Sequence, residues 1–328
     1  MKKVAIVTGI TGQDGSFLSD LLLEKGFDVY GLKRRSSSHS LGCSAHLEND
    51  IEVVEGDLLD LPSLENLCKK VRPHMFFNLA AQSHVRTSFD QPANTLQINA
   101  LGVLHCLEAI KQSGIFTKFY QASTSEMFGG VLHSGDNILN EDSLFHPRSP
   151  YGCAKLYAHW ITVNYRESYN MFNCCGILFN HESPRRGPNF VTRKISLAIA
   201  KIKLGLQEKL FLGNLDAKRD WGHAQDYVKG MYQMLNHNDP DDYVLSTGEA
   251  HSVREFCKLA FDHAGLGSYE DYVQINPAFY RPAEVHVLLG DSSKANKTFG
   301  WEHTMSFEDL VKDMVDSDMK LVSKGKEE

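Results

Sequence analysis

Short runs of apolar and β-branched residues alternate, over the first part of the chain, with longer segments whose apolar residues recur at helical spacing. This alternation is typical of a parallel sheet with helices on both faces. The predicted strands are Val4–Thr8, Val29–Lys33, Ile51–Val54, Met75–Leu79, Phe119–Ala122 and Asn173–Phe179. The predicted helices between them are Gly12–Lys25, Leu61–Lys70, Asn94–Gln112 and Pro150–Ser168. We therefore expect an α/β fold with a doubly wound Rossmann-type parallel sheet.

The alternation becomes less regular after about residue 180. The elements predicted there are helices Val191–Leu204, Ala224–Leu235, Val253–His263 and Phe307–Leu321, and a strand Tyr243–Ser246. No linker rich in Pro, Gly or Ser separates the two parts. We expect residues 1–180 to form a dinucleotide-binding Rossmann domain, with later contributions near 215–248, and residues 181–328 to form mainly a smaller α/β substrate-binding lobe. Ligands of such folds bind where the strands end.

The composition excludes several classes of protein. The 328 residues are 42% hydrophobic and 23% charged, and 34 basic against 41 acidic side chains give a net charge of −7. A chain of this charge has no general attraction for nucleic acid or anionic membranes. The seven cysteines show neither a C-x-x-C pair nor zinc-ligand spacing, so we expect reduced thiols and no metal site. Neither a secretory signal nor a membrane span is recognisable, which predicts a cytoplasmic protein.

Three glycines stand in the turn between the first strand and the first helix, with the spacing G-x-x-G-x-x-G. Gly9 permits a tight turn, Gly12 lets the backbone approach a pyrophosphate, and Gly15 lets helix and strand pack closely. The helix N-terminus then offers free N–H groups to an anion. The other candidate cofactor-binding residues in this turn are Thr11, Gln13 and Asp14.

The second strand ends in Arg34, Arg35 and Ser36 rather than in the acidic residue that binds the ribose of NAD. Two guanidinium groups and a hydroxyl suit a 2′-phosphate, which favours NADP, although a solvated basic loop would also explain them. The ends of the third and fourth strands are expected to line the same cofactor. The candidates there are Asp57, Leu58, Leu79, Ala80, Ala81, Gln82 and Ser83.

Tyr151 and Lys155 form a Y-x-x-x-K pair at the start of a predicted helix, and this spacing places both side chains on one helix face. A lysine ammonium group, together with an oxidised nicotinamide ring, lowers the pKa of a nearby phenol. The phenolate can then accept a hydroxyl proton during hydride transfer. The pair therefore indicates a dehydrogenase site.

The fifth predicted strand is followed by Thr124, Ser125 and Glu126. A hydroxyl group at this strand end can bond the substrate oxygen that Tyr151 deprotonates. Oxidation of an alcohol does not need a carboxylate at this place. Loss of water from a ketosugar does, because a base must remove the proton α to the carbonyl and an acid must protonate the departing hydroxyl. Glu126 could do both, unless it is simply a surface residue.

These motifs resemble the extended short-chain dehydrogenase/reductase superfamily, and more closely its GDP-mannose 4,6-dehydratase family, over nearly the whole chain. The resemblance rests on residues 8–15, 34–38, 123–126, 148–151 with Lys155, 180–187, 219–222 and 281–285. It implies conversion of GDP-α-D-mannose to GDP-4-dehydro-6-deoxy-D-mannose and water, a step that feeds GDP-deoxyhexose synthesis.

The resemblance also implies roles for single residues. Thr124 would bond the sugar O4, and Glu126 would act at C5 and C6. Tyr151 would take the O4 proton while Lys155 assists and holds the nicotinamide ribose, so that both residues also contact the cofactor. His181 and Arg186 would contact the cofactor. The candidates for binding the nucleotide sugar are Ser83, Ser125, Asn180, Arg185, Lys194, Arg219, Arg281 and Glu284.

Two features depart from the family pattern. The segment Leu41–Leu47 lacks an arginine that the family usually has, and Asn94 replaces a common tyrosine. In the family the loop at residues 41–47 reaches a neighbouring subunit's cofactor in a tetramer, and the tyrosine lies near the cofactor. The departures therefore leave the cofactor affinity and the oligomer type open, and either a homodimer or a homotetramer is expected here. Two other functions stay open: another nucleotide-sugar epimerase or reductase, and a non-catalytic NADP-sensing protein. A dehydratase could in addition reduce its own 4-keto product with NADPH.

Overall fold

The main feature of the computed structural model is a sheet of seven parallel strands in the order β10-β6-β5-β4-β1-β2-β3. The structure describes residues 2–37, 40–130, 138–280, 282–283 and 285–325. The strands are β1 (Val4–Thr8), β2 (Asp28–Lys33), β3 (Glu52–Glu55), β4 (Met75–Asn78), β5 (Lys118–Thr124), β6 (Asn173–Leu178) and β10 (Asp242–Leu245). This sheet confirms the predicted fold class.

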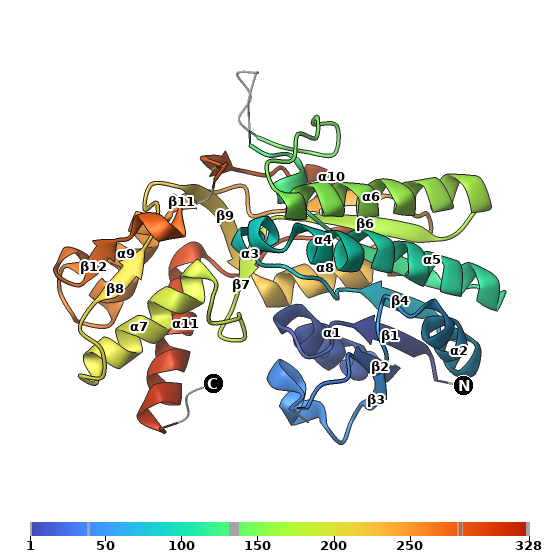
Figure 1. The fold of residues 1–328 in the computed structure, drawn as a ribbon, viewed down its shortest axis with the longest axis horizontal. Coiled ribbons are helices and arrows are strands. Elements are labelled where there is room, and N and C mark those ends of the chain that lie inside the picture. The colour runs from blue at the N-terminus through green and yellow to red at the C-terminus, as the bar shows by residue number, and fades with distance from the viewer. Residues whose placement is uncertain (1, 38–39, 131–137, 281, 284, 326–328) are drawn as a thin grey trace.

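Helices cover both faces of the sheet (Figure 1). Helices α1 (Gln13–Glu24), α8 (Ala224–Asn236) and α10 (Ser293–Phe299) lie on one face, whereas α2 (Leu61–Val71), α5 (Gly102–Ser113) and α6 (Pro150–Tyr169) lie on the other. Side chains alternate accordingly along β1. Ala5 and Val7 belong to the apolar core under α1 and α8, and Ile6 to the core on the opposite face. Burial on both sides explains the nearly continuous apolar sequence of these strands.

Strand β5 is longer than predicted, because its backbone pairing continues beyond Ala122 to Thr124. Ser123 and Thr124 are polar, so the apolar pattern stops before the strand does. Their partners in β6 are Ile177 and Leu178. The extension places Thr124 at the last position of the strand, directly beside the turn that holds Glu126.

The helix predicted over Asn94–Gln112 is interrupted. It consists of α4 (Pro92–Leu96), a π-helical turn (Gln97–Leu101) and α5, and it follows the unpredicted short helix α3 (Val85–Asp90). Asn99 lies within the π-helical turn, where its side chain exchanges two hydrogen bonds of 2.8 Å with the main chain of Gln82. A widened turn of this kind is common near functional sites.

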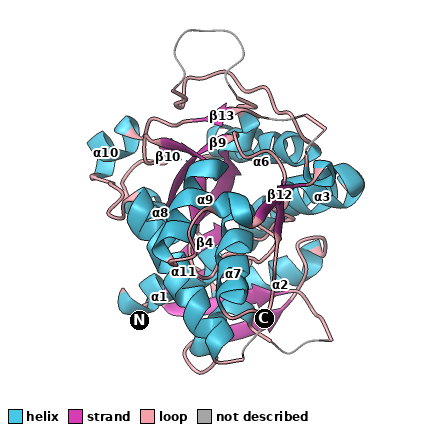
Figure 2. Cartoon of the chain, turned by 90° about the vertical axis from the view of Figure 1, so that its left-hand side faces the viewer, coloured by secondary structure: helices cyan, strands magenta, loops and turns pink. Residues whose placement is uncertain are grey.

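The later part of the chain forms a second lobe. Helices α7 (Val191–Lys203), α9 (Val253–His263) and α11 (Phe307–Ser323) pack around an apolar core of their own (Figure 2). The unpredicted short strands are β7 (Asn180–Glu182), β8 (Leu210–Leu212), β9 (Lys218–His223), β11 (Ala250–Ser252), β12 (Val273–Ile275) and β13 (Val287–Leu288). Strand β10 comes from this later part of the chain but belongs to the large sheet. The division into two domains at residue 180 stays a prediction. No helix among the described residues is long and apolar enough to span a membrane.

Candidate active site

The glycine turn brings α1 close to β1. Gly9 has a φ of 69°, and its carbonyl accepts a hydrogen bond of 3.0 Å from Gly12 N. A Cβ atom at Gly15 would lie 2.4 Å from that same carbonyl oxygen, so only glycine fits. Gly12 is the N-cap of α1 and supplies no capping side chain. The first-turn N–H groups are therefore available to an anion, which fits the pyrophosphate of a dinucleotide.

The other predicted cofactor residues lie at the same edge of the sheet, because β4, β2 and β3 run parallel to β1 on either side of it. Arg34, Arg35 and Ser36 are exposed after β2. Asp57 Oδ1 accepts a bond from Leu59 N after β3. The segment after β4 is held by the neighbouring strand β1, since Thr8 Oγ1 accepts from the N–H groups of both Leu79 and Ala80.

The segment Leu41–Leu47 packs on the glycine turn of its own chain. Cys43 N donates to the carbonyl of Thr11 at 3.1 Å, and Ser44 Oγ donates to that of Ile10 at 2.6 Å. This segment, which lacks the arginine expected from the resemblance, is thus folded against the glycine turn.

A cavity of about 320 Å³ lies between the ends of the sheet strands and the second lobe. Of the predicted site residues, those that line it are Asp14, Leu79, Ala81, Ser83, Thr124, Ser125, Glu126, Tyr151, Lys155, Asn180, His181, Arg186, Lys194 and Arg219. The sequence thus identified residues from both lobes that the fold brings to one cavity.

Tyr151 and Lys155 lie one turn apart at the start of α6, which Ser149 caps by accepting a bond of 3.0 Å from Gly152 N. Both side chains are buried. Lys155 Nζ lies 5.9 Å from the centre of the Tyr151 ring and donates to the carbonyl of Ala122 at 2.9 Å. The ammonium group is therefore beside the phenol and anchored to β5.

Burial raises the pKa of Tyr151 to about 12; a hydrogen bond with Thr124 opposes this rise, and the negative charge of Glu126 adds to it. Burial lowers the pKa of Lys155 to about 8, against the attraction of Asp14. Tyr151 is accordingly a neutral phenol at pH 7. A further positive charge is needed before it can act as a base.

Thr124 and Glu126 adjoin the tyrosine. Thr124 Oγ1 accepts from Glu126 N at 3.3 Å, which begins the 3-10 turn Ser125–Met127. A Cβ atom at Gly152 would lie 2.8 Å from the carbonyl oxygen of Glu126, so the absence of a side chain there lets α6 approach this turn. The result is a buried carboxyl group in the same cavity wall as a hydroxyl and a phenol.

Asp14 and His181 form an ion pair across the two parts of the chain, with Oδ2 and Nε2 2.8 Å apart. Burial favours the neutral forms, but the pair outweighs it: the pKa of His181 is raised, and that of Asp14 is lowered to about 2. Gln13 strengthens this connection, since its amide donates to the carbonyl of His181 and accepts from Ser183 Oγ. The side chain of Gln13 thus holds α1 to the segment after β6.

The second lobe contributes cations. Lys194 Nζ lies 3.7 Å from the centre of the Phe279 ring, and burial lowers its pKa. Arg219 donates bonds of 2.8 Å to the carbonyls of Lys218 and Val285. The Arg186 guanidinium stacks on the Phe190 ring at 3.7 Å.

Some predicted residues are placed elsewhere. Arg185 does not line the cavity; its guanidinium pairs with Asp20 at 2.7 Å and lies over the ring of Phe17. Its proposed contact with substrate stays a prediction. Arg281 and Glu284 lie outside the described residues.

Glu182, Phe190 and Phe279 line the cavity but were not identified from the sequence. Glu182 lies within the segment 180–187 that carries the resemblance, so that segment was its only signal. Phe190 and Phe279 have no sequence pattern that distinguishes them from core residues.

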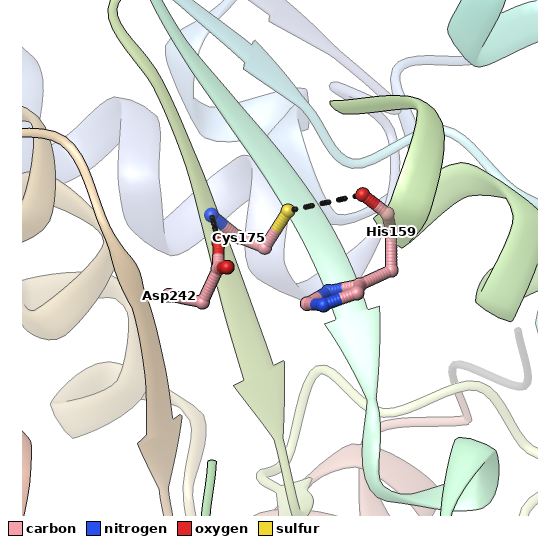
Figure 3. Close-up of side chains that lie close together, drawn as sticks. All are labelled: His159, Cys175 and Asp242. Carbon is pink, nitrogen blue, oxygen red and sulfur yellow. Dashed lines mark hydrogen bonds between the residues drawn. The ribbon is translucent and has the colours of Figure 1, made fainter. Parts of the chain in front are cut away.

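Within the described part of the chain, His159, Cys175 and Asp242 have ligand-type atoms within 4.8 Å of one another (Figure 3). Cys175 Sγ donates to the backbone carbonyl of His159, and Asp242 accepts from Cys175 N. The Asp242 carboxylate is also held by two bonds, of 2.9 and 2.8 Å, from the Arg166 guanidinium. Because that carboxylate is already neutralised, this group is explained as a structural link between α6, β6 and β10.

Three features together define a class of protein: a Rossmann-type sheet, a Y-x-x-x-K pair beside a strand-end threonine, and a second lobe that carries cations. This class is the short-chain dehydrogenases/reductases that modify nucleotide sugars. The chain belongs to the GDP-mannose 4,6 dehydratase family, whose family model matches residues 6–314. It is 49% identical to the GDP-mannose 4,6 dehydratase of Cricetulus griseus, with 98% of this chain and 92% of the relative covered. It is 50% identical to GDP-mannose 4,6 dehydratase 2 of Arabidopsis thaliana, with 99% and 89% covered.

Solved structures agree with this fold. RMD from Pseudomonas aeruginosa, complexed with NADPH, has a TM-score of 0.80 at 25% identity, with 97% of this chain and 99% of that chain covered. The UDP-glucose 4-epimerase of Thermotoga maritima with UDP-glucose has a TM-score of 0.86 at 25% identity, with 97% and 99% covered.

Proposed function

We propose that this chain converts GDP-α-D-mannose to GDP-4-dehydro-6-deoxy-D-mannose and water. The proposal is supported by family membership over residues 6–314 and by relatives of that name at about half identity. The observation that carries it is the buried carboxyl group of Glu126 in the cavity wall that also holds Thr124, Tyr151 and Lys155. Together they supply the groups for oxidation at one carbon and elimination at its neighbours.

The cofactor we propose is NADP, which when bound would supply the redox chemistry, by accepting a hydride from C4 of the sugar and giving it back at C6. The glycine turn and the uncapped N-terminus of α1 would hold its pyrophosphate, and Arg34 and Arg35 its 2′-phosphate. His181 and Arg186 would lie at its nicotinamide half. A relative with this fold has been solved with NADPH.

Tyr151 takes the proton from O4, which Thr124 fixes by a hydrogen bond. Lys155 favours the phenolate by its positive charge. The carboxylate of Glu126 then removes the proton from C5, and the resulting acid protonates the hydroxyl that leaves C6 as water. A proton returns to C5, so that the balance is the loss of one water molecule.

The diphosphate of the nucleotide sugar is proposed to lie against Lys194 and Arg219 on the second lobe. These cations face the cavity of a chain whose net charge is −7, so the positive charge is concentrated where two anionic ligands must bind. We further propose that the enzyme is cytoplasmic and works as a homodimer or homotetramer.

Glu126→Gln tests the elimination step. Ketosugar formation from GDP-mannose should fall by about 10² or more, because the amide can neither remove the C5 proton nor protonate the leaving hydroxyl. Glu208→Gln is the matched control, since Glu208 is an exposed glutamate between α7 and β8 and does not line the cavity. Full turnover by Glu126→Gln would disprove the elimination role.

Product chromatography distinguishes the other functions. The unmodified protein, incubated with GDP-mannose and NADP+, should give the 4-keto-6-deoxy sugar. An epimerised hexose that keeps its 6-hydroxyl group would instead support the epimerase alternative. Excess NADPH in a parallel incubation shows whether the keto product is reduced further.

A further inference from the structure

A buried ion pair joins the second lobe's helices α7 and α11. The Nε atom of Arg193 lies 2.9 Å from both carboxylate oxygens of Asp318, and Ser196 Oγ donates to Oδ2 at 2.6 Å. The side chain of Arg193 is 2% exposed and that of Asp318 is fully buried. Asp318 belongs to the last helix of the chain, far in sequence from every predicted site residue.

The guanidinium of Arg193 also binds the loop that precedes α7. Its Nη1 atom donates to the main-chain carbonyl of Arg186 at 2.9 Å and to that of Pro184. These carbonyls belong to the loop Ser183–Gly187, which carries Arg186 into the cavity. A planar guanidinium can bind a carboxylate on one edge and main-chain carbonyls on another, which a lysine ammonium cannot.

Thr192, which directly precedes Arg193, helps to hold the side chain of Arg186. Thr192 Oγ1 donates to Glu182 Oε2 at 2.6 Å, and this oxygen lies 3.0 Å from Arg186 Nε. Two neighbours on the first turn of α7 thus fix Arg186 from both sides: Arg193 holds its main chain, and Thr192 orients the carboxylate that holds its side chain.

We propose that Arg193, oriented by Asp318, is a positioning residue for Arg186 and sets the affinity of the cavity for the dinucleotide. The proposal rests on the proposed function, in which Arg186 contacts NADP. A buried ion pair contributes little net stability by itself, because desolvation offsets its attraction. The role of this pair lies instead in the loop before α7. Asp318 holds the guanidinium in the orientation in which it binds the carbonyls of Pro184 and Arg186, and these bonds fix the loop conformation.

Binding of NADP+ followed by titration calorimetry tests the proposal. Arg193→Lys keeps the charge but cannot bind Asp318 and both carbonyls, so its Kd for NADP+ should rise about tenfold, as expected for the loss of about one charged hydrogen bond. In the Arg186→Ala background the same substitution should have no further effect, because Arg193 acts through Arg186.

Arg166→Lys is the matched control. Arg166 also makes two bonds to a carboxylate, that of Asp242, and one to a main-chain carbonyl, but between α6, β6 and β10. It should lower the melting temperature and leave the Kd for NADP+ within twofold of the parent value. If Arg193→Lys does not fold, Asp318→Asn, which keeps the shape of the side chain, replaces it in the same comparison.

The proposal is overturned if Arg193→Lys binds NADP+ like the parent, if Arg166→Lys weakens binding equally, or if the effect of Arg193→Lys persists in full without the Arg186 side chain. These results leave the proposed function intact whenever Arg186→Ala alone weakens binding. Unchanged binding by Arg186→Ala would refute the cofactor contact itself, and the positioning role with it.

Discussion

In the proposed mechanism Tyr151 acts as a base, and Lys155 lies beside its ring. Burial raises the pKa of the phenol to about 12, and the positive charge of Arg186 opposes this rise. Lys155→Met removes a positive charge that lies 5.9 Å from the ring centre. We expect kcat for ketosugar formation to fall by roughly 10² to 10⁴.

The pH–rate profile shows whether that loss is electrostatic. In the proposed mechanism Tyr151 acts in its deprotonated form, so the rate should rise with pH through its pKa, and removal of the neighbouring cation should move this rise to higher pH. Lys69→Met, at an exposed lysine of α2, is the control. An unshifted profile in Lys155→Met would mean that the lysine acts by holding β5 rather than by its charge.

The ion pair of Asp14 and His181 predicts a pH-dependent stability. Asp14 has a pKa lowered from 3.8 to about 2, so its contribution is present above pH 3.8 and is lost as the pH falls towards 2. His181 has a pKa raised above 6.5, so its contribution is complete below that pH and is lost as the pH rises through the raised value. The pair stabilises the fold most between about pH 4 and pH 6.5.

Asp14→Asn should therefore lower the melting temperature most in that window, by about 5 °C. The difference from the parent should decrease on either side of it. Asp262→Asn, at an exposed aspartate of α9, serves as the control. A difference that is constant from pH 4 to pH 9 would contradict the ion pair as the cause.

The sequence predicts best the strands that are covered by helices on both faces of the sheet. Strands such as β1 and β6 are buried along nearly their whole length, so their apolar runs are unmistakable. Strand β9 was missed because Arg219 and Asp220 interrupt its sequence. Asp220 can be buried because residues distant in sequence bond its carboxylate, which accepts from Thr247 and Gly248. Burial raises its pKa to about 6. No pattern in the neighbouring residues contains that information.

The same limit applies to the candidate site. Motifs with fixed spacing, such as Tyr151 with Lys155, were found because one helix turn relates their residues. Arg193 was not found, because its role depends on Asp318 in another helix. Arg185 and Arg186 are adjacent in sequence, and the resemblance assigned both to ligands, yet one contacts α1 and the other lines the cavity. The backbone conformation of the loop that contains them, set by tertiary contacts, decides where each side chain lies.

The π-helical turn between α4 and α5 gives a prediction at the scale of an element. Asn99→Leu removes both bonds to the main chain of Gln82 and leaves its N–H and carbonyl groups without these partners. The free energy of unfolding should fall by about 1–3 kcal/mol in urea titrations. Binding of NADP+ should weaken too, because Ser83, the residue after Gln82, lines the cavity.

Asn66→Ala is the control for that experiment, since Asn66 has an exposed side chain on α2. It should change neither measurement appreciably. If Asn99→Leu were as stable as Asn66→Ala and bound NADP+ equally well, the π-helical turn would have no part in forming the site.

At the scale of the whole molecule, one surface is more apolar than a single chain requires. Leu96 on α4, Leu101 in the π-helical turn, and Tyr157 and Trp160 on α6 are exposed by 55%, 42%, 43% and 54%. These segments lie next to one another on the outer side of the sheet's helical layer (Figure 1). Exposed large apolar side chains on adjoining segments are typical of protein interfaces.

We expect a second copy of the chain to cover this surface, since a symmetric dimer pairs the same patch on both subunits. Trp160→Glu should then shift the sedimentation coefficient towards that of a 36.9 kDa monomer, because the charge would be buried at the contact. Phe116→Glu, at an isolated residue with 73% exposure beyond α5, should leave assembly unchanged. Because Tyr151 and Lys155 lie on the same helix as Trp160, dissociation should also reduce turnover at low protein concentration. A Trp160→Glu protein that sediments like the parent would place the oligomer contact on another surface.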